Sequence, residues 1–183
     1  MQTFRELRRI AVIGAGSAGR DLALRCVRAG FDVTLEDVMP SRLRNAHHAI
    51  ASEATPGALH LASTVEDAVR DADLAIDFVP DELESKLEIF SMLDRMAPPR
   101  TILCTPSSAL SIADLASCTY RPQLCFALRF PASNAAELIF TSRSSSESLT
   151  AVERWLTAIG FNVTTKQDPA ELAQSTIKPD TQN

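Results

Sequence analysis

Apolar and polar positions follow two different periods along this chain. Short apolar runs typical of buried strands cover residues 9–13, 31–37, 58–62, 73–80, 101–105, 123–130, 137–141 and 160–165. Between them, apolar residues three or four positions apart predict helices over residues 17–29, 41–53, 64–69, 82–97, 112–116 and 146–159. Strands that alternate with helices predict an α/β fold, a doubly wound, mostly parallel sheet in a single domain.

Three glycines, Gly14, Gly16 and Gly19, follow the first strand at G-x-G-x-x-G spacing and lead into the first helix. The first allows a sharp turn, the second leaves no side chain between the backbone and a pyrophosphate, and the third lets helix and strand pack closely. The helix N-terminus adds free N–H groups and a positive dipole end. The spacing predicts a Rossmann-like dinucleotide site.

The second predicted strand ends in acidic residues, and Asp37 lies 18 positions (37 − 19) past the third glycine. A carboxylate there can accept the ribose hydroxyls of adenosine and would repel the 2′-phosphate of NADP. The alternative is that Asp37 serves only as a turn or cap residue. Strand, glycines, helix, strand and acid in this order favour NAD.

Composition excludes several classes of partner. The 183 residues are 45% hydrophobic and 22% charged, enough apolar content for one core. The net charge is −5, and the basic residues are scattered, which argues against nucleic acid and anionic membrane surfaces as partners. No apolar run approaches the ~18 residues of a membrane span, and the charged first residues do not read as a signal peptide. We therefore expect a cytoplasmic protein.

Candidate metal ligands are few. His47 and His48 are adjacent and point to different sides of a helix, so we expect surface histidines and no metal site. The cysteines lack C-x-x-C spacing and lie in apolar sequence, which predicts buried free thiols in a reducing compartment. They are Cys26, Cys104, Cys118 and Cys125.

The expected domain covers residues 1–168. Residues 169–183 are polar, and we expect them to form a disordered tail.

Residues 75–90, 97–103 and 107–112 resemble the NAD-binding domain of 3-hydroxyacyl-CoA dehydrogenases, and the similarity runs in order from Arg9 to Lys166. The resemblance implies that Asp81 and Lys86 lie by the cofactor. The structural alternatives are that Asp81 caps a helix and that Lys86 pairs with Glu82 at i, i+4. Together with the glycine loop, the expected NAD-binding set is Gly14, Gly16, Ser17, Ala18, Gly19, Asp37, Val79, Pro80, Asp81, Lys86 and Ser107.

The sequence departs from the family where catalysis takes place. Arg129 stands at the family's catalytic histidine, and Thr141 or Phe140 stands at the glutamate that orients it. Arginine stays protonated and cannot act as the base, whose loss typically removes ~10²- to 10⁴-fold of rate. Glu137 is close to the glutamate position but has no histidine to orient.

Other departures concern the substrate. The family's substrate-contacting serine maps to Ser108, with Ser107 an equally close candidate because Pro106 replaces the usual asparagine. The candidate catalytic set is therefore Ser108 and Arg129. The family's CoA-contacting hairpin is short here, over residues 41–59, and we expect its helical second domain to have no counterpart. An exposed cleft then implies a homodimer or a partner chain.

Three functions follow from these observations. The first is an NAD-dependent oxidoreductase of the 3-hydroxyacyl-CoA dehydrogenase type, acting on acyl-CoA in fatty acid metabolism and completed by a partner chain or by dimerisation. The second is a non-catalytic NAD-binding sensor or subunit in which Arg129 holds an anion. The third is a dehydrogenase of another small hydroxy or keto acid, in which Arg129 binds the substrate carboxylate.

Overall fold

The computed structural model describes residues 6–175, which are built around one eight-stranded sheet. The strands lie in the order β3-β2-β1-β4-β5-β6-β7-β8. β1 to β6 are parallel, β7 is antiparallel to β6, and β8 is parallel to β7, so the predicted doubly wound, mostly parallel sheet is confirmed. The strands are β1 (Arg9–Ile13), β2 (Asp32–Glu36), β3 (Leu59–Ala62), β4 (Leu74–Asp77), β5 (Ile102–Pro106), β6 (Cys125–Ala132), β7 (Ala135–Phe140) and β8 (Asn162–Gln167).

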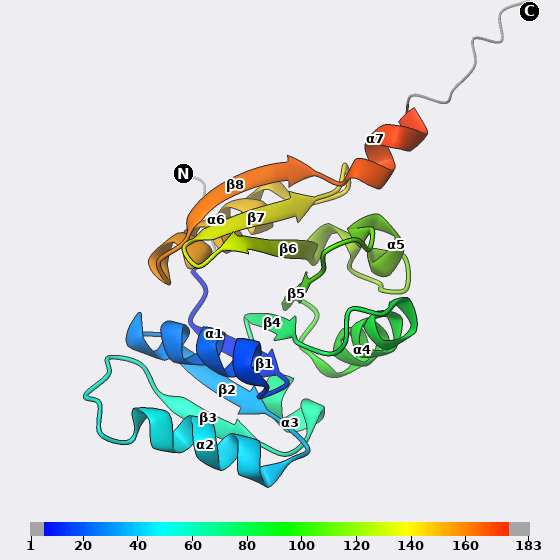
Figure 1. Ribbon diagram of the computed structural model, residues 1–183. Helices are drawn as coiled ribbons and strands as arrows, with labels where there is room; N and C mark the ends of the chain where they lie inside the picture. Colours follow the sequence, from blue (N-terminus) through cyan, green and yellow to red (C-terminus); the bar gives the residue numbers. More distant parts are fainter. Residues whose placement is uncertain (1–5, 176–183) are drawn as a thin grey trace, which may run out of the picture.

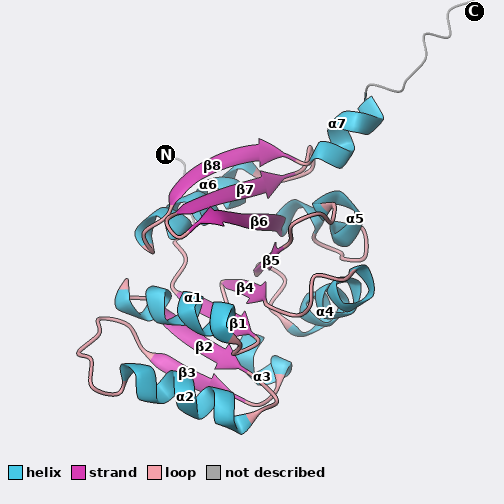
Figure 2. Ribbon diagram, viewed as in Figure 1, coloured by secondary structure: helices cyan, strands magenta, loops and turns pink. Residues whose placement is uncertain are grey.

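Helices cover both faces of the sheet (Figures 1 and 2). In chain order they are α1 (Ser17–Arg28), α2 (Pro40–Ile50), α3 (Val65–Val69), α4 (Leu83–Met96), α5 (Ile112–Ala116), the short 3₁₀ helix η1 (Pro122–Leu124), α6 (Ser146–Ala158) and α7 (Pro169–Ser175). α1, α2 and α6 share one apolar cluster, and α3, α4 and α5 share the other. Strand β1 contributes to both: Ile10 and Val12 point to the first, Ala11 and Ile13 to the second. This period of two is what a strand buried on both faces requires.

Local signals explain where the helices begin and end. The side chains of Thr64, Ser111 and Ser145 each cap a helix by accepting the backbone N–H of the third helical residue. Gly30 and Gly160 follow α1 and α6 with φ of 98° and 95°, a left-handed conformation that glycine adopts without strain. The sequence predicted both of these helices to within two residues.

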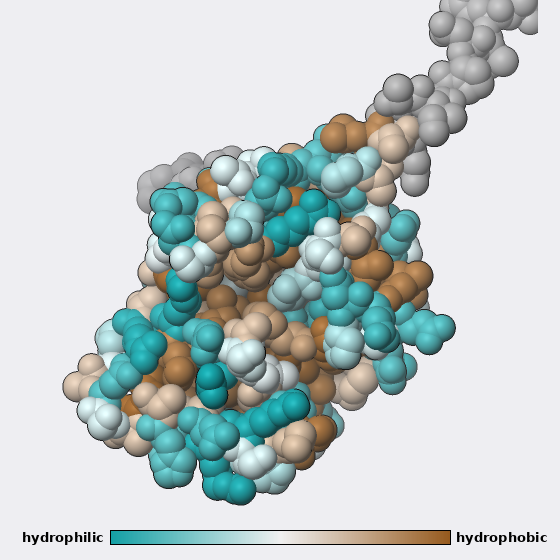
Figure 3. Space-filling view, viewed as in Figure 1, coloured by the Kyte–Doolittle hydropathy of each residue, from teal (hydrophilic) through white to brown (hydrophobic). Residues whose placement is uncertain are grey.

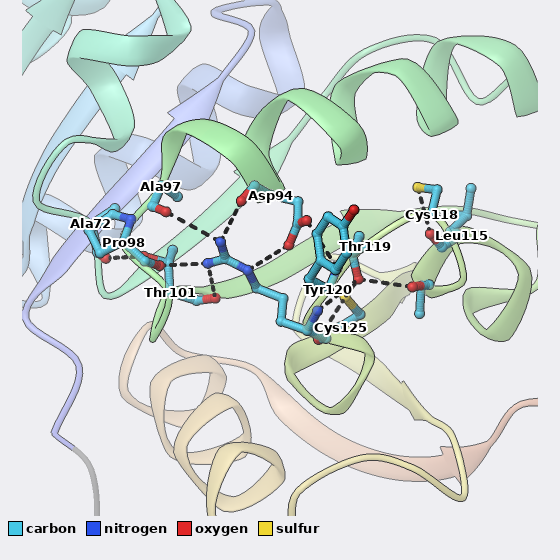
Figure 4. A network of polar contacts seen from close by, with 12 residues as sticks. Ala72, Asp94, Ala97, Pro98, Thr101, Leu115, Cys118, Thr119, Tyr120 and Cys125 are labelled. Carbon is cyan, nitrogen blue, oxygen red and sulfur yellow. Dashed lines mark hydrogen bonds and ion pairs between the residues drawn. The ribbon is translucent and has the colours of Figure 1, made fainter.

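An arginine remote in sequence closes the C-terminus of α4. Its partners Asp94, Ala97, Pro98 and Thr101 are labelled in Figure 4. Arg121 is buried and pairs with Asp94 at 2.8 Å. Its remaining donors reach the main-chain oxygens of Asp94, Ala97, Pro98 and Thr101. Because the last carbonyls of a helix have no partner within it, this guanidinium satisfies groups that burial would otherwise leave unpaired.

The prediction of a disordered tail from Pro169 is wrong for residues 169–175, which form α7. The buried carboxylate of Asp168 explains the helix, because it accepts the N–H of Ala170 at 3.0 Å on one oxygen. Its other oxygen accepts the Ser111 hydroxyl and the Ala113 N–H, which ties α7 to the start of α5. The rest of the predicted tail, 176–183, lies outside the described residues.

Within residues 6–175, no helix is long and apolar enough to cross a membrane. All four cysteines are free; three are buried and Cys118 is half-buried. His47 and His48 are exposed, as expected. Over the same residues, no group of three or more His, Cys, Asp and Glu side chains is placed to hold a metal ion.

Candidate functional site

The sheet order changes direction between β1 and β4, because the chain goes outward from β1 to β2 and β3 and then returns to β4. In doubly wound sheets, ligands bind in the crevice beside the carboxyl ends of the strands at such a point. Two cavities meet there, and both are lined by Phe78 and Val79, which follow β4. Figure 3 shows apolar side chains in a recess near the middle of the visible face.

The three glycines of the loop between β1 and α1 lie in different structural environments, which explain differently why each position is a glycine. Gly14 has a φ of 101°, a turn that favours glycine. A Cβ on Gly19 would lie 1.9 Å from the carbonyl oxygen of Gly14, so any larger residue would force helix and strand apart. A Cβ on Gly16 would meet nothing within 4 Å. The described residues give no packing reason for Gly16, and the open space beside it is available to a ligand.

The N-terminus of α1 opens on this space. Gly16 is its N-cap residue, no side chain caps the helix, and its first turn contains no acidic residue. The first N–H groups of a helix have no partners within it. Together with the positive end of the helix dipole, the N–H groups of Ser17, Ala18 and Gly19 form an anion site. The residues present therefore fit the pyrophosphate of a dinucleotide.

Asp37 holds the glycine loop in place. Its carboxylate, 4% exposed, accepts the Ala15 N–H at 2.8 Å and the Met39 N–H at 2.8 Å, and it contacts the Arg42 guanidinium at 3.3 Å. Burial alone would raise the pKa of Asp37, but these two N–H groups and the charge of Arg42 bring it below its ordinary value of 3.8. Asp37 is thus ionised at neutral pH. An ionised carboxylate can accept about four hydrogen bonds. Asp37 accepts three here, so one position remains for a hydrogen bond from a ligand hydroxyl.

The β2-side cavity, of about 440 Å³, lies next to Asp37. Its polar lining includes Glu36 and Arg42, and Pro80 and Ile89 supply apolar walls. Burial, and then the charge of Asp37, raises the pKa of Glu36. This cavity has the mixed character that an adenosine group requires, apolar walls with a few polar groups at one end.

The β6-side cavity, of about 550 Å³, is reached past Phe78 and is lined by Lys86, Ser107 and Arg129 among others. Lys86 is 1% exposed, and its ammonium pairs with Asp77 at 2.7 Å. It does not pair with Glu82, because Glu82 is the N-cap residue of α4 and Lys86 faces the end of β4. Burial raises the pKa of Asp77, and the charge of Lys86 opposes this effect.

Asp81 does not cap α4, since Glu82 occupies the N-cap position. One oxygen of the Asp81 carboxylate accepts both the N–H and the hydroxyl of Ser108, each at 2.8 Å. Burial alone would raise the pKa of Asp81, but these hydrogen bonds, and the charge of Lys86, lower it from 3.8. The Ser107 hydroxyl accepts the Leu110 N–H at 3.0 Å. Ser108 therefore donates both its N–H and its hydroxyl to Asp81.

Arg129 is half-buried in the β6-side cavity, and its Nε lies 3.4 Å from the carbonyl oxygen of Ser107. Glu137 is directly opposite Arg129 in the ladder between β6 and β7, but its carboxylate pairs with Lys166. Thr141 and Phe140 are the two residues expected at the position of the orienting glutamate. The N–H and hydroxyl of Thr141 contact the Ser144 hydroxyl in a turn. No histidine lines this cavity.

The structure thus brings the predicted residues together in two groups. Gly14, Asp37, Val79 and Pro80 line the β2-side cavity, and Val79, Asp81, Lys86, Ser107, Ser108 and Arg129 line the β6-side cavity. Gly16, Ser17, Ala18 and Gly19 stand at the start of α1. The sequence did not nominate Phe78 or Arg42. Phe78 directly follows β4, and its place at the end of a predicted strand is the only sequence signal that could have nominated it.

Residues 9–168 match the family model of the 3-hydroxyacyl-CoA dehydrogenase NAD binding domain. The chain is 32% identical to a probable 3-hydroxybutyryl-CoA dehydrogenase of Bacillus subtilis over 141 residues, 68% of this chain and 49% of that protein. It is 28% identical to a 3-hydroxybutyryl-CoA dehydrogenase of Bradyrhizobium diazoefficiens over 193 residues, 94% of this chain and 66% of that protein. A solved diketoreductase superposes with a TM-score of 0.79 at 27% identity, covering 88% of this chain and 65% of that one. The chain thus spans about half to two thirds of these relatives' lengths.

Proposed function

The chain belongs to the 3-hydroxyacyl-CoA dehydrogenase family through its NAD-binding domain, and on this premise we propose that it binds NAD(H) across the two cavities. The observation that carries the proposal is Gly16. Its missing side chain has no structural reason among the described residues, whereas a pyrophosphate at the uncapped N-terminus of α1 would need that space.

Each part of the site has a partner group in the dinucleotide. Residues Gly16 to Gly19 hold the pyrophosphate, and Asp37 accepts an adenosine ribose hydroxyl. Val79 and Pro80 line the adenosine side, while Asp81, Lys86 and Ser107 lie beside the nicotinamide ribose. Bound NAD supplies the hydride acceptor at its nicotinamide ring.

Calorimetric titration with NADH tests this proposal. We expect one site per chain and a weaker response to NADPH, because an ionised Asp37 repels a 2′-phosphate. Nicotinamide emission is the better optical signal, since Trp155 is buried in α6. An absence of heat with millimolar NADH would contradict the proposal.

We propose further that these residues alone do not turn over 3-hydroxyacyl-CoA. Arg129 remains protonated and cannot accept the hydroxyl proton, and Ser108 donates to Asp81. The expected result is NADH binding without acetoacetyl-CoA reduction. Measurable turnover would show that another group moves the proton, and the chain would then be a complete oxidoreductase.

Both cavities are open, and the β6-side cavity has apolar walls at Phe78 and Phe130. We propose that a second copy or a partner chain covers them, which a measurement of solution mass would test. We also propose a cytoplasmic location, which the four unpaired cysteines support because a reducing compartment keeps thiols free.

A further inference from the structure

Arg129 is a basic side chain of the β6-side cavity that no acidic neighbour neutralises. Lys86 is neutralised by Asp77, and Glu137 by Lys166. Among residues 6–175, no carboxylate lies within ion-pair distance of the Arg129 guanidinium. A half-buried cation without a counter-ion is costly, and a ligand anion would remove that cost.

The contact that Arg129 does make prepares it for a ligand. Nε is directed to the Ser107 carbonyl oxygen, so the two terminal nitrogens remain as a planar pair of donors on a tethered side chain. Such a fork matches the two oxygens of a carboxylate.

Two acidic side chains also line the cavity, and both are engaged: Glu137 pairs with Lys166, and Asp81 accepts two hydrogen bonds from Ser108. Asp81 comes from the turn before α4, beside the β2-side cavity, and it is tied to Ser108. Arg129 comes from β6, which β4 and β5 separate from β1 and its glycine loop. Neither acid lies within ion-pair distance of Arg129, so the charge of Arg129 is available to an anion in this cavity.

We infer that the β6-side cavity binds a small carboxylic acid whose carboxylate is held by Arg129, next to the nicotinamide end of NAD(H). This inference rests on the proposed function and names the ligand class of the same site. One free positive charge matches a monoanion, and no second free cation lines the cavity for a dianionic phosphate. Arg129 stands where the family has a catalytic histidine that moves a proton. In this chain the residue at that position selects the ligand by its charge.

The test compares acetoacetate with methyl acetoacetate, an ester of nearly the same shape without the charge. Each is titrated calorimetrically into the complex of the protein with saturating NADH. We expect acetoacetate to bind at least about tenfold more tightly than the ester, because a charge-assisted pair to arginine is lost in the ester.

Two variants locate the effect. Arg129→Gln removes the charge and keeps hydrogen-bond donors, and we expect it to bind NADH but to lose the preference for the acid. Arg95→Gln, an exposed arginine on α4, serves as the matched control and should retain that preference.

The outcomes are distinguishable. If the wild-type protein binds NADH but does not discriminate between acid and ester, or if Arg129→Gln still discriminates, the inference is wrong and the proposed function stands. If the wild-type protein does not bind NADH, both the proposed function and this inference are wrong.

Discussion

Replacing Gly16 by alanine separates binding from folding. The backbone there has φ of −61° and ψ of 179°, which any residue adopts, and the new methyl group would meet nothing within 4 Å. Alanine is a poorer N-cap residue than glycine, but it also restricts the unfolded chain by ~0.4–1 kcal/mol. The two effects nearly cancel. We expect stability within about 1 kcal/mol of the wild type, and a melting temperature within about 4 °C.

Dinucleotide binding should respond quite differently to Gly16→Ala. The methyl group would occupy the space that a pyrophosphate needs and keep it from the N–H groups of α1. Loss of one hydrogen bond to a charged group is worth ~1.5–3 kcal/mol, so the dissociation constant for NADH should rise about tenfold to a hundredfold.

Gly19→Ala is the contrasting variant. Its Cβ would lie 1.9 Å from the Gly14 carbonyl oxygen, an overlap that only a backbone shift can relieve. We expect this variant to melt at a much lower temperature. Thermal melts and NADH calorimetry on both variants check the reasoning. It is refuted if Gly16→Ala binds NADH within twofold of the wild type, or if it unfolds as readily as Gly19→Ala.

Three further predictions concern stability. Lys86→Met leaves the Asp77 carboxylate buried without its partner, so urea unfolding should show a loss of ~3–5 kcal/mol in the free energy of unfolding. The double variant Lys86→Met with Asp77→Leu should recover most of this loss. An unchanged urea midpoint for the single variant would contradict this prediction. Arg121→Met unpairs Asp94 and the end of α4, with an expected loss of similar size, again ~3–5 kcal/mol, and loss of amide protection in the last turn of α4 by hydrogen exchange. Because the pKa of Asp37 is lowered in the folded state, its ionisation stabilises the fold above pH 3.8, and this contribution is lost as pH falls through the folded pKa. The stability difference between wild type and Asp37→Asn should therefore be constant near neutral pH and shrink below about pH 4; an increase on acidification would refute the assignment.

Local signals in the sequence predicted much of the fold and the first part of the site. Glycine spacing, a periodic apolar stripe and a glycine after the last turn were enough for α1, because these determinants act within a few residues. The placement of Gly14, Gly16 and Gly19 follows from the same short-range geometry.

Side-chain pairings between distant segments could not be predicted in this way. Spacing within one helix suggested Glu82 as the partner of Lys86, but α4 begins only at Leu83 and the ammonium reaches back to Asp77. Arg121 and Asp94 are likewise brought together by the packing of α4 against the segment before β6. No periodic pattern encodes such contacts, since they depend on how elements are arranged in space.

The Asp37 carboxylate bridges the glycine loop and the turn after β2 through its hydrogen bonds from the Ala15 and Met39 N–H groups. The receptor for the pyrophosphate is thus preorganised, and little conformational entropy remains to be lost when the dinucleotide arrives. The affinity for the dinucleotide then depends on the contacts that it makes with the loop. We expect NADH to associate rapidly, in a single kinetic phase, because the loop does not have to become ordered first.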